Sequence, residues 1–583
     1  MTHDDRPATS WTRRHALFGC ALALGVAIRV VVVVAYRPAL LYTDTFSYLT
    51  AARTFSLLPD RPIGYSFFMS PFVWGFHSLS TAMFAIQIVQ HLIGLGLAVA
   101  VYAFLRRRGL PGWGATLATL PLLLDPLELV LEHYILSDLL FAALLVVAVL
   151  VLFWNHRPGW SAVAVAGLMI SFATLVRGAG TFLAAVFVVA LLFLRVPWRR
   201  IGAFLLAFIV PVAAYAIAYH HQHGQYSTTS QGPDFLYARI APIVDCHDPT
   251  LQLTGPEKLL CPRLPVGDER LNTNEYRWDA TRSPLFLIHT PPGETHEQFV
   301  AKFDKAVVRA QPWTYAKAVL KDAARGFAPT RNEQVPGYPS EYWLFQDDYW
   351  IGPIDVSAGV HDPIMGKVSA DHGAASFMTQ YRKFVYMPGP LAALLLLLGL
   401  VASLGFGRSR VCGNRVLIGT VTGACVLVLL TGAALSSLSW RYQLPQIALA
   451  PMAGALAISA LARGRAAGAP ERRPAVRPLD RGAALLARLP LSDRLRTTLE
   501  RATRSGWAQI FVAACLGVAV AVVLTVGAVG SGYFRLGDAA LVGLGAGVVA
   551  AVLLIVGRTR LVREEAAGDA DRPRAAATRP TGS

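Results

Sequence analysis

Long apolar runs separated by short polar segments dominate this chain of 583 residues. Twelve of the runs are about as long as a helix that crosses a bilayer, roughly twenty residues. They lie near 16–36, 80–105, 114–131, 138–154, 161–176, 179–194, 200–219, 388–406, 415–435, 443–463, 507–530 and 538–557. The pattern predicts an all-α polytopic membrane protein with about 12 transmembrane helices. The runs within 114–154 and 161–194 could instead form half-buried hairpins.

The polar segments between the runs suggest how the chain is divided. In order, we predict a cytoplasmic N-terminus at 1–15, a transmembrane core at 16–219 with a polar first loop at 37–79, a loop domain at 220–387, further core spans at 388–463, a basic linker at 464–506, two extra spans at 507–557 and a disordered tail at 558–583. Helical periodicity at 294–327, with charges on one face, predicts an α-rich loop domain.

Composition narrows the class of protein. Hydrophobic residues make up 54% of the chain and charged residues only 15%, which excludes a water-soluble domain of this size. A net charge of +17 would suggest nucleic acid as a partner of a soluble chain. Here the basic residues lie in short segments between apolar runs, so we expect the bilayer as the partner and no nucleic acid.

The basic segments also predict the orientation. With a cytoplasmic N-terminus, the segments at 106–112, 155–160, 195–200, 407–415 and 462–506 are all inside, and each is basic. The first loop and the loop at 220–387 are then extracytoplasmic, and the C-terminus is cytoplasmic. The first apolar run resembles a signal peptide, but it lacks a small-residue cleavage site, which favours an uncleaved span.

The first loop carries the most suggestive chemistry. Asp44 begins a predicted helix and Tyr48 follows one turn later, ahead of the segment from Arg61 to Tyr65. A carboxylate at a helix start is typical of an N-cap. It could also act as a general base on an acceptor hydroxyl, and the two interpretations are compatible.

Three arginines and a second aspartate are further candidates. Arg29 lies inside the first run, where a charge is costly and is usually paired, although it could also snorkel to the surface. Its candidate partners are Asp44, Glu128, Glu132 and Asp138. Arg177 and Arg441 lie at predicted outer helix ends, where a guanidinium could hold a lipid phosphate or simply anchor the helix. Asp138 could equally be a helix cap.

Cysteine and histidine give little sign of a metal site. Cys246 and Cys261 lie in the long loop, and an extracytoplasmic location favours a disulfide over two free thiols. No CxxC or Cys/His zinc spacing occurs in the sequence. The cluster at His220, His221 and His223 is more typical of polar residues at a membrane surface than of metal ligands.

These residues together resemble a known family. Asp44, Tyr48 and the segment RPIGY at 61–65 are similar to the acidic first loop and the R-P-P-G-Y-P element of GT-C superfamily glycosyltransferases. SDLLF at 137–141, VRG at 176–178 and RYQLP at 441–445 resemble later elements, in the same order. Within this superfamily, the motifs are most similar to those of enzymes that use polyprenyl-phosphate sugars, such as protein O-mannosyltransferases and the aminoarabinose transferase of lipid A. The resemblance covers about residues 16–463.

The resemblance implies a GT-C-like bundle and an inverting sugar transfer from a polyprenyl phosphate on the extracytoplasmic face. Asp44 matches the catalytic residue. The residues expected to bind substrate are Arg29, Tyr48, Arg61, Tyr65, Asp138, Arg177, Arg441 and Tyr442.

The sequence also departs from the family pattern. Many relatives have two adjacent acids in the first loop, but Thr45 follows Asp44 here, which puts a divalent metal in doubt, and no other cofactor is implied. Asp138 stands where the family usually has Glu, and Ile63 and Ser66 stand where it has Pro.

We therefore expect a membrane glycosyltransferase whose acceptor is a protein, glycan or lipid. A transporter or flippase of lipid-linked sugars is the alternative, because many carriers also have twelve spans. Against it, no repeated halves and no matching broken spans are evident. A polysaccharide ligase or polymerase with a similar lipid donor is a third possibility.

Overall fold

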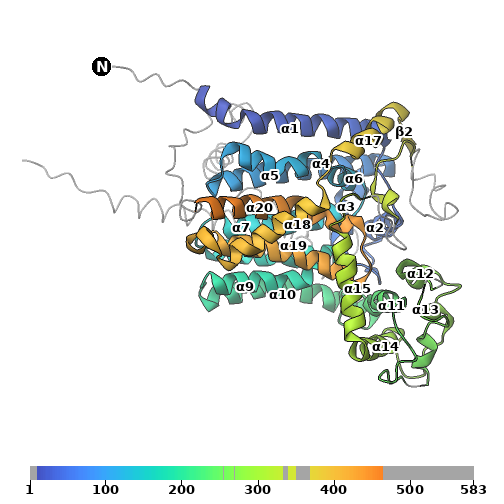
Figure 1. The fold of residues 1–583 in the computed structure, drawn as a ribbon. Helices are drawn as coiled ribbons and strands as arrows, with labels where there is room; N and C mark the ends of the chain where they lie inside the picture. Colours follow the sequence, from blue (N-terminus) through green and yellow to red (C-terminus); the bar gives the residue numbers. More distant parts are fainter. Residues whose placement is uncertain (1–8, 254, 268–269, 332–338, 350–367, 464–583) are drawn as a thin grey trace, which may run out of the picture. The chain divides into compact units, whose positions relative to one another are not determined.

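A computed structural model describes residues 9–253, 255–267, 270–331, 339–349 and 368–463 (Figure 1). These residues belong to the first of two compact units, Met1–Arg473. The predicted linker, the two extra spans and the tail, at 464–583, lie outside the described residues.

Helices make up nearly all of the regular structure. The part of the chain that precedes the loop domain contains α1 (Thr9–Ala35), β1 (Tyr36–Arg37), α2 (Thr43–Thr54), α3 (Gly64–Gly75), α4 (Leu79–Arg107), α5 (Gly112–Leu124), α6 (Pro126–His133), α7 (Asp138–Phe153), α8 (Trp160–Val176), α9 (Gly180–Phe193) and α10 (Trp198–His223). The part that follows contains β2 (Ser369–Ala370), α17 (His372–Phe384), α18 (Gly389–Leu404), η3 (Gly407–Val411), α19 (Arg415–Leu435), η4 (Trp440–Gln443) and α20 (Leu444–Arg463).

Helix length and composition identify a membrane protein. Within the described residues, five helices are long and apolar enough to cross a bilayer: His15–Ala35, Leu79–Arg107, Trp198–His223, Arg415–Leu435 and Trp440–Ala462. Two bent pairs, α5 with α6 and α17 with α18, raise the number to seven if each pair is one span. Each of the ten apolar runs predicted between 16 and 463 contains a helix, but not every helix is long enough to span, so twelve spans are not confirmed.

The break between α5 and α6 has a cause in the sequence. Asp125 accepts a hydrogen bond from the backbone N–H of Leu127, and Pro126 begins α6, so the predicted span at 114–131 breaks into two helices at an angle of 47°. Helices α7, α8 and α9 have 16, 17 and 14 residues. Residues of α7 are buried on nearly every side, as expected of an apolar helix inside a bundle.

Close helix packing forms the core of the bundle. Helix α8 packs against α7 and α10, α18 packs against α20, and α5 lies between α1 and α4. Gly167 of α8 allows a close approach of α10, because a Cβ there would lie 2.4 Å from the backbone oxygen of Phe204.

The loop domain is α-rich, as the periodicity predicts. It contains α11 (Gly232–Ile240), η1 (Glu257–Leu260), α12 (Thr273–Trp278), α13 (Pro284–Leu287), α14 (His296–Ala310), α15 (Pro312–Arg325) and η2 (Ser340–Trp343). A disulfide joins Cys246 to Cys261 beside an apolar core that includes Tyr237, Phe299 and Phe303. The helical stretch at 294–327 is two helices, because Pro312 cannot continue α14 and begins α15 instead.

The first loop lies at the end of the bundle where α1 stops and α4 begins, here called the site end (Figure 1). Its two helices, α2 and α3, pack against each other, and α3 also packs on α4 and α8. Leu40 pairs with Tyr134, and β1 pairs antiparallel with β2. The loop is therefore a packed part of the fold, held by strand pairing as well as by helix contacts.

Candidate active site

Asp44 lies in the first turn of α2. Tyr42, the residue before the helix, is extended, so it occupies the N-cap position in place of Asp44. The hydroxyl of Thr45 accepts from the backbone N–H of Tyr42 at 3.0 Å and donates to the carbonyl of Ile135 at 3.1 Å. Thr45 thereby fixes the start of α2 and ties it to α6–α7, which leaves the carboxylate of Asp44 available for other partners.

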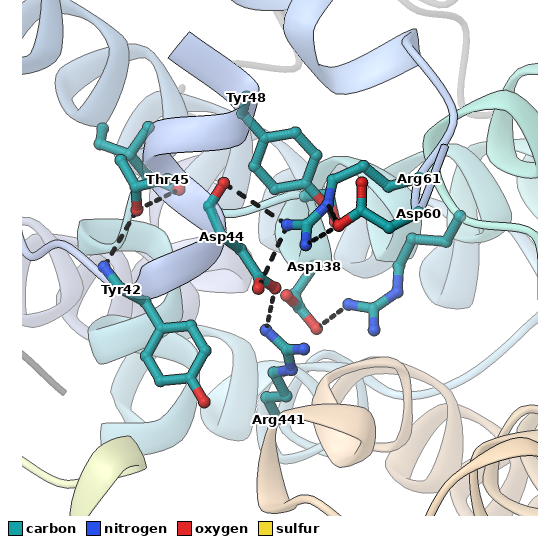
Figure 2. Close-up of polar contacts among 11 residues, drawn as sticks. Tyr42, Asp44, Thr45, Tyr48, Asp60, Arg61, Asp138 and Arg441 are labelled. Carbon is teal, nitrogen blue, oxygen red and sulfur yellow. Dashed lines mark hydrogen bonds and ion pairs between the residues drawn. The ribbon is translucent and has the colours of Figure 1, made fainter. Parts of the chain in front are cut away.

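Two arginines hold the carboxylate of Asp44 (Figure 2). Its Oδ1 lies 3.1 Å from Nη1 of Arg61, and its Oδ2 accepts from Nη1 of Arg441 at 2.9 Å. Burial alone would raise the pKa of Asp44, but the positive charges of Arg61 and Arg441 hold it well below its usual range. Asp44 is therefore ionised, and while both arginines remain bound it is a weak base.

Arg61 is itself fixed by neighbours in the first loop. Its guanidinium forms an ion pair with Asp60 and lies 5.0 Å from the centre of the Tyr48 ring. The Tyr48 hydroxyl donates to Oγ of Ser137 at 2.9 Å, and burial raises the pKa of Tyr48. The fully buried ring of Tyr65 packs edge-on against Tyr48 and donates its hydroxyl to Gln90. Tyr48 thus contacts the guanidinium of Arg61, and Tyr65 packs against the ring of Tyr48.

A second ion pair lies next to the first. Arg177, which follows α8, pairs with Asp138 at the start of α7 and lies 5.1 Å from the centre of the Tyr442 ring. Figure 2 shows the carboxylate of Asp138 beside the Asp44–Arg441 pair. Oδ2 of Asp138 and Nε of Arg441 are buried without a hydrogen-bond partner among the described residues. One acceptor and one donor of this cluster are therefore unsatisfied, which is typical of a site that completes its hydrogen bonds with a ligand.

Eight of the nine residues predicted for the site thus lie together or in direct support of it. Those that lie together are Asp44, Tyr48, Arg61, Asp138, Arg177, Arg441 and Tyr442, and Tyr65 supports them by packing against Tyr48. Three aspartates face three arginines, so the cluster, here called the ion-pair cluster (Asp44, Asp60, Arg61, Asp138, Arg177 and Arg441), has no net charge. An anionic phosphate could compete with the carboxylates for the same guanidinium groups.

Arg29 lies elsewhere. Both ends of its guanidinium bind Glu132, through Nε at 2.8 Å and Nη2 at 2.6 Å. The three other N–H donors bind the carbonyls of Gly25, Leu122 and Leu123. All five donors of Arg29 are occupied, and no hydrogen bond or ion pair among the described residues joins it to the ion-pair cluster. The geometry therefore favours a structural role for Arg29 over the predicted contact with substrate.

Three contributors were not singled out from the sequence. Asp60 immediately precedes Arg61, so its ion pair could have been foreseen from the adjacent charges. Tyr42 and Trp343 face the guanidinium of Arg441 at 5.5 and 5.1 Å. No local pattern could have placed Trp343 there, because it lies about three hundred residues beyond Tyr42.

The histidines at the end of α10 contact residues outside the ion-pair cluster. Nε2 of His223 lies 2.7 Å from the carbonyl of Leu57, and the ring of His220 stacks on Tyr226. In the described part of the chain, no three His, Cys, Asp or Glu side chains are arranged to hold a metal ion.

No family model matches the sequence, and no curated protein does either. Among solved structures, the chain is similar to the archaeal oligosaccharyltransferase AglB from Archaeoglobus fulgidus, in complex with an inhibitory peptide and a dolichol-phosphate. The sequences are 12% identical, the match covers 90% of this chain and the TM-score is 0.32. The chain spans 56% of that neighbour's length. A TM-score of this size does not establish a shared fold.

Proposed function

We propose that this chain is a membrane glycosyltransferase that moves a sugar from a polyprenyl-phosphate donor to an acceptor hydroxyl on the extracytoplasmic face. The observation that carries the proposal is the carboxylate of Asp44, held between Arg61 and Arg441 at the site end of a membrane bundle. The acceptor is a hydroxyl of a protein, a glycan or another lipid.

The arginines suit the donor phosphate. Arg61, Arg177 and Arg441 are permanently charged, and each is already oriented by a carboxylate and an aromatic ring. In a phosphate complex, oxygens of the phosphate would replace these carboxylates as partners of the guanidinium groups, which would need little reorientation. The lipid tail of the donor would stay among the apolar helices, since the cluster lies where those helices end.

Phosphate binding would also activate Asp44. Once Arg61 and Arg441 turn toward the phosphate, their hold on the carboxylate weakens and its pKa returns toward the usual value, so it becomes a better proton acceptor. Asp44 then takes the proton of the acceptor hydroxyl, whose oxygen bonds to the anomeric carbon of the sugar. The bond from that carbon to the phosphate oxygen breaks, and its electron pair leaves with the polyprenyl phosphate, which the arginines stabilise.

The alternative is a transporter or flippase of lipid-linked sugars. One observation favours it: Glu132 binds both Arg29 and His91 inside the bundle, and buried charged clusters of this kind occur along transport pathways. The occupied donors of Arg29 argue for a fixed anchor instead.

Proteoliposomes with radiolabelled polyprenyl-phosphate mannose, glucose or arabinose distinguish the two. An extract of the host membranes supplies acceptors. A glycosyltransferase releases label from the polyprenyl lipid into acceptor or water, and Arg441→Gln abolishes the release. A flippase leaves the label on the lipid and moves it between leaflets. Leaflet exchange without release from any donor would contradict the proposal.

A further inference from the structure

Arg441 is enclosed by aromatic rings. The centres of the Tyr42, Trp343 and Tyr442 rings lie 5.5, 5.1 and 5.5 Å from the carbon of its guanidinium. Tyr42 and Tyr442 come from the first loop and from η4, so they belong to segments that the site already uses. Trp343 is different, because it reaches Arg441 from the far end of the loop domain.

The segment that carries Trp343, residues 339–349 and here called the strap, is bound to the site end by three tyrosine hydroxyls. Tyr36 donates to the carbonyl of Gln346 at 2.5 Å, and Tyr134 donates to that of Tyr342 at 2.9 Å. In return, Tyr349 of the strap donates to the carbonyl of Ala39 at 2.7 Å. Backbone and side-chain groups on both sides are thus joined, which fixes the strap at the residues flanking Trp343.

Trp343 itself is held by its ring. The side chain is 1% exposed, and its ring centre lies 5.0 Å from that of Tyr42 and 5.9 Å from that of Tyr134. Its indole Nε1 is buried with no hydrogen-bond partner among the described residues. Ring packing and the cation–π contact with Arg441 are therefore the interactions through which this residue can act.

We propose that Trp343 is a positioning residue: its ring, fixed by the strap, sets the guanidinium of Arg441 at Asp44 and at the donor phosphate. The loop domain then contributes to phosphate binding without touching the phosphate. The part that concerns phosphate rests on the proposed function, whereas the coupling between Trp343 and Arg441 does not.

Binding of polyprenyl phosphate to the purified full-length protein tests the proposal. A buried cation–π contact is worth about 2 kcal/mol, so Trp343→Ala should weaken binding by roughly 10- to 30-fold. Trp343→Phe keeps a ring and should recover most of the affinity. Trp313 is a matched control, because it is an exposed tryptophan of α15 with Lys317 over its ring, and Trp313→Ala should leave binding unchanged.

A double-mutant cycle decides whether Trp343 acts through Arg441. In an Arg441→Gln background, Trp343→Ala should have almost no further effect on Kd. Additive effects, or a Trp343→Phe protein as weak as Trp343→Ala, would overturn the proposal. If Trp343→Ala does not fold, Tyr134→Phe removes one of the hydroxyls that bind the strap and should weaken polyprenyl-phosphate binding in the same direction, by a smaller factor. Unchanged binding of polyprenyl phosphate by Tyr134→Phe would contradict the proposed role of the strap.

The same cycle measured by Tm separates this proposal from the proposed function. If the wild-type protein binds no polyprenyl phosphate, the function has failed. Non-additive Tm shifts for Trp343→Ala and Arg441→Gln would still support the coupling, and additive shifts would overturn it.

Discussion

At the scale of single residues, the site depends on competition for guanidinium groups. Asp44, Asp60 and Asp138 each pair with an arginine, and the side chain of Asp44 is the one shared by two, Arg61 and Arg441. Such a carboxylate is positioned but not reactive. Chemistry begins only when another anion takes the arginines, and this links binding of the donor to activation of the base.

The low pKa of Asp44 predicts how stability depends on pH. Because the folded pKa lies below the unfolded value of about 3.9, the ion pairs stabilise the protein fully above that value and are lost as pH falls through the folded pKa. The Tm difference between wild type and Asp44→Asn should therefore be constant from about pH 5 to 8 and shrink only below about pH 4. A difference that already shrinks near pH 6 would contradict the assigned shift.

The candidate residues could be predicted from the sequence, but their partners could not. The types and positions of Asp44, Asp138, Arg177 and Arg441 in the chain indicated one functional end. The pairing of Asp44 with Arg441 joins residues almost four hundred positions apart, which no local pattern reports. The cost of a buried charge makes Arg29 a candidate site residue, but in the structure Glu132, one of its four candidate partners, binds its guanidinium.

At the scale of elements, Arg29 connects three helices. It bridges Glu132 of α6 and the last carbonyls of α5 from within α1. Those carbonyls are left without partners inside α5 because the helix breaks at Asp125. The guanidinium therefore stabilises the break in the predicted span as well as the buried carboxylate.

Removing one partner of this pair should be strongly destabilising. We expect Arg29→Met to lower the free energy of unfolding by about 3–5 kcal/mol, because it removes the bidentate partner of the buried Glu132 carboxylate. Adding Glu132→Leu should restore much of the loss. Unfolding in mixed detergent micelles measures the stability of both variants. If the single and double variants are equally destabilised, the loss of the Arg29–Glu132 pair is not the cause.

The disulfide should stabilise the loop domain. It closes a loop of 15 residues, for which the chain-entropy model gives about 3 kcal/mol. Cys246→Ser should therefore make residues 220–331 more sensitive to limited proteolysis. Cys20→Ser, which removes an exposed free cysteine, is the control. Equal digestion of both variants would mean that the apolar core of the domain suffices alone.

At the scale of the whole molecule, the apolar runs predicted the helices of the described residues and most of their bounds, and the main exception is the run at 114–131, which forms two helices. Hydrophobic periodicity alone does not show where a Pro or a capping Asp divides a helix, as at Asp125 and Pro126 in the run at 114–131 and at Pro312 in the helical stretch at 294–327. The distribution of basic residues predicts an extracytoplasmic site end, and this orientation is part of the proposed function.

Labelling at the two ends of α10 tests the orientation. Tyr226 and Trp198 are 74% and 76% exposed and flank this helix. In a Cys20→Ser background, Tyr226→Cys should react with a membrane-impermeant maleimide in intact cells, and Trp198→Cys only after permeabilisation. The opposite pattern would place the site end in the cytoplasm.

The Asp44→Asn variant tests the central claim most directly, if polyprenyl-phosphate binding and sugar release are measured on the same preparation. Loss of the competing carboxylate should leave Kd unchanged or lower it, because Arg61 and Arg441 are freed for the phosphate. Release should fall by roughly 100- to 10,000-fold, the usual contribution of a general base. Weaker binding with release near the wild-type rate would contradict the account, since Asp44 would then hold the arginines without taking part in the transfer.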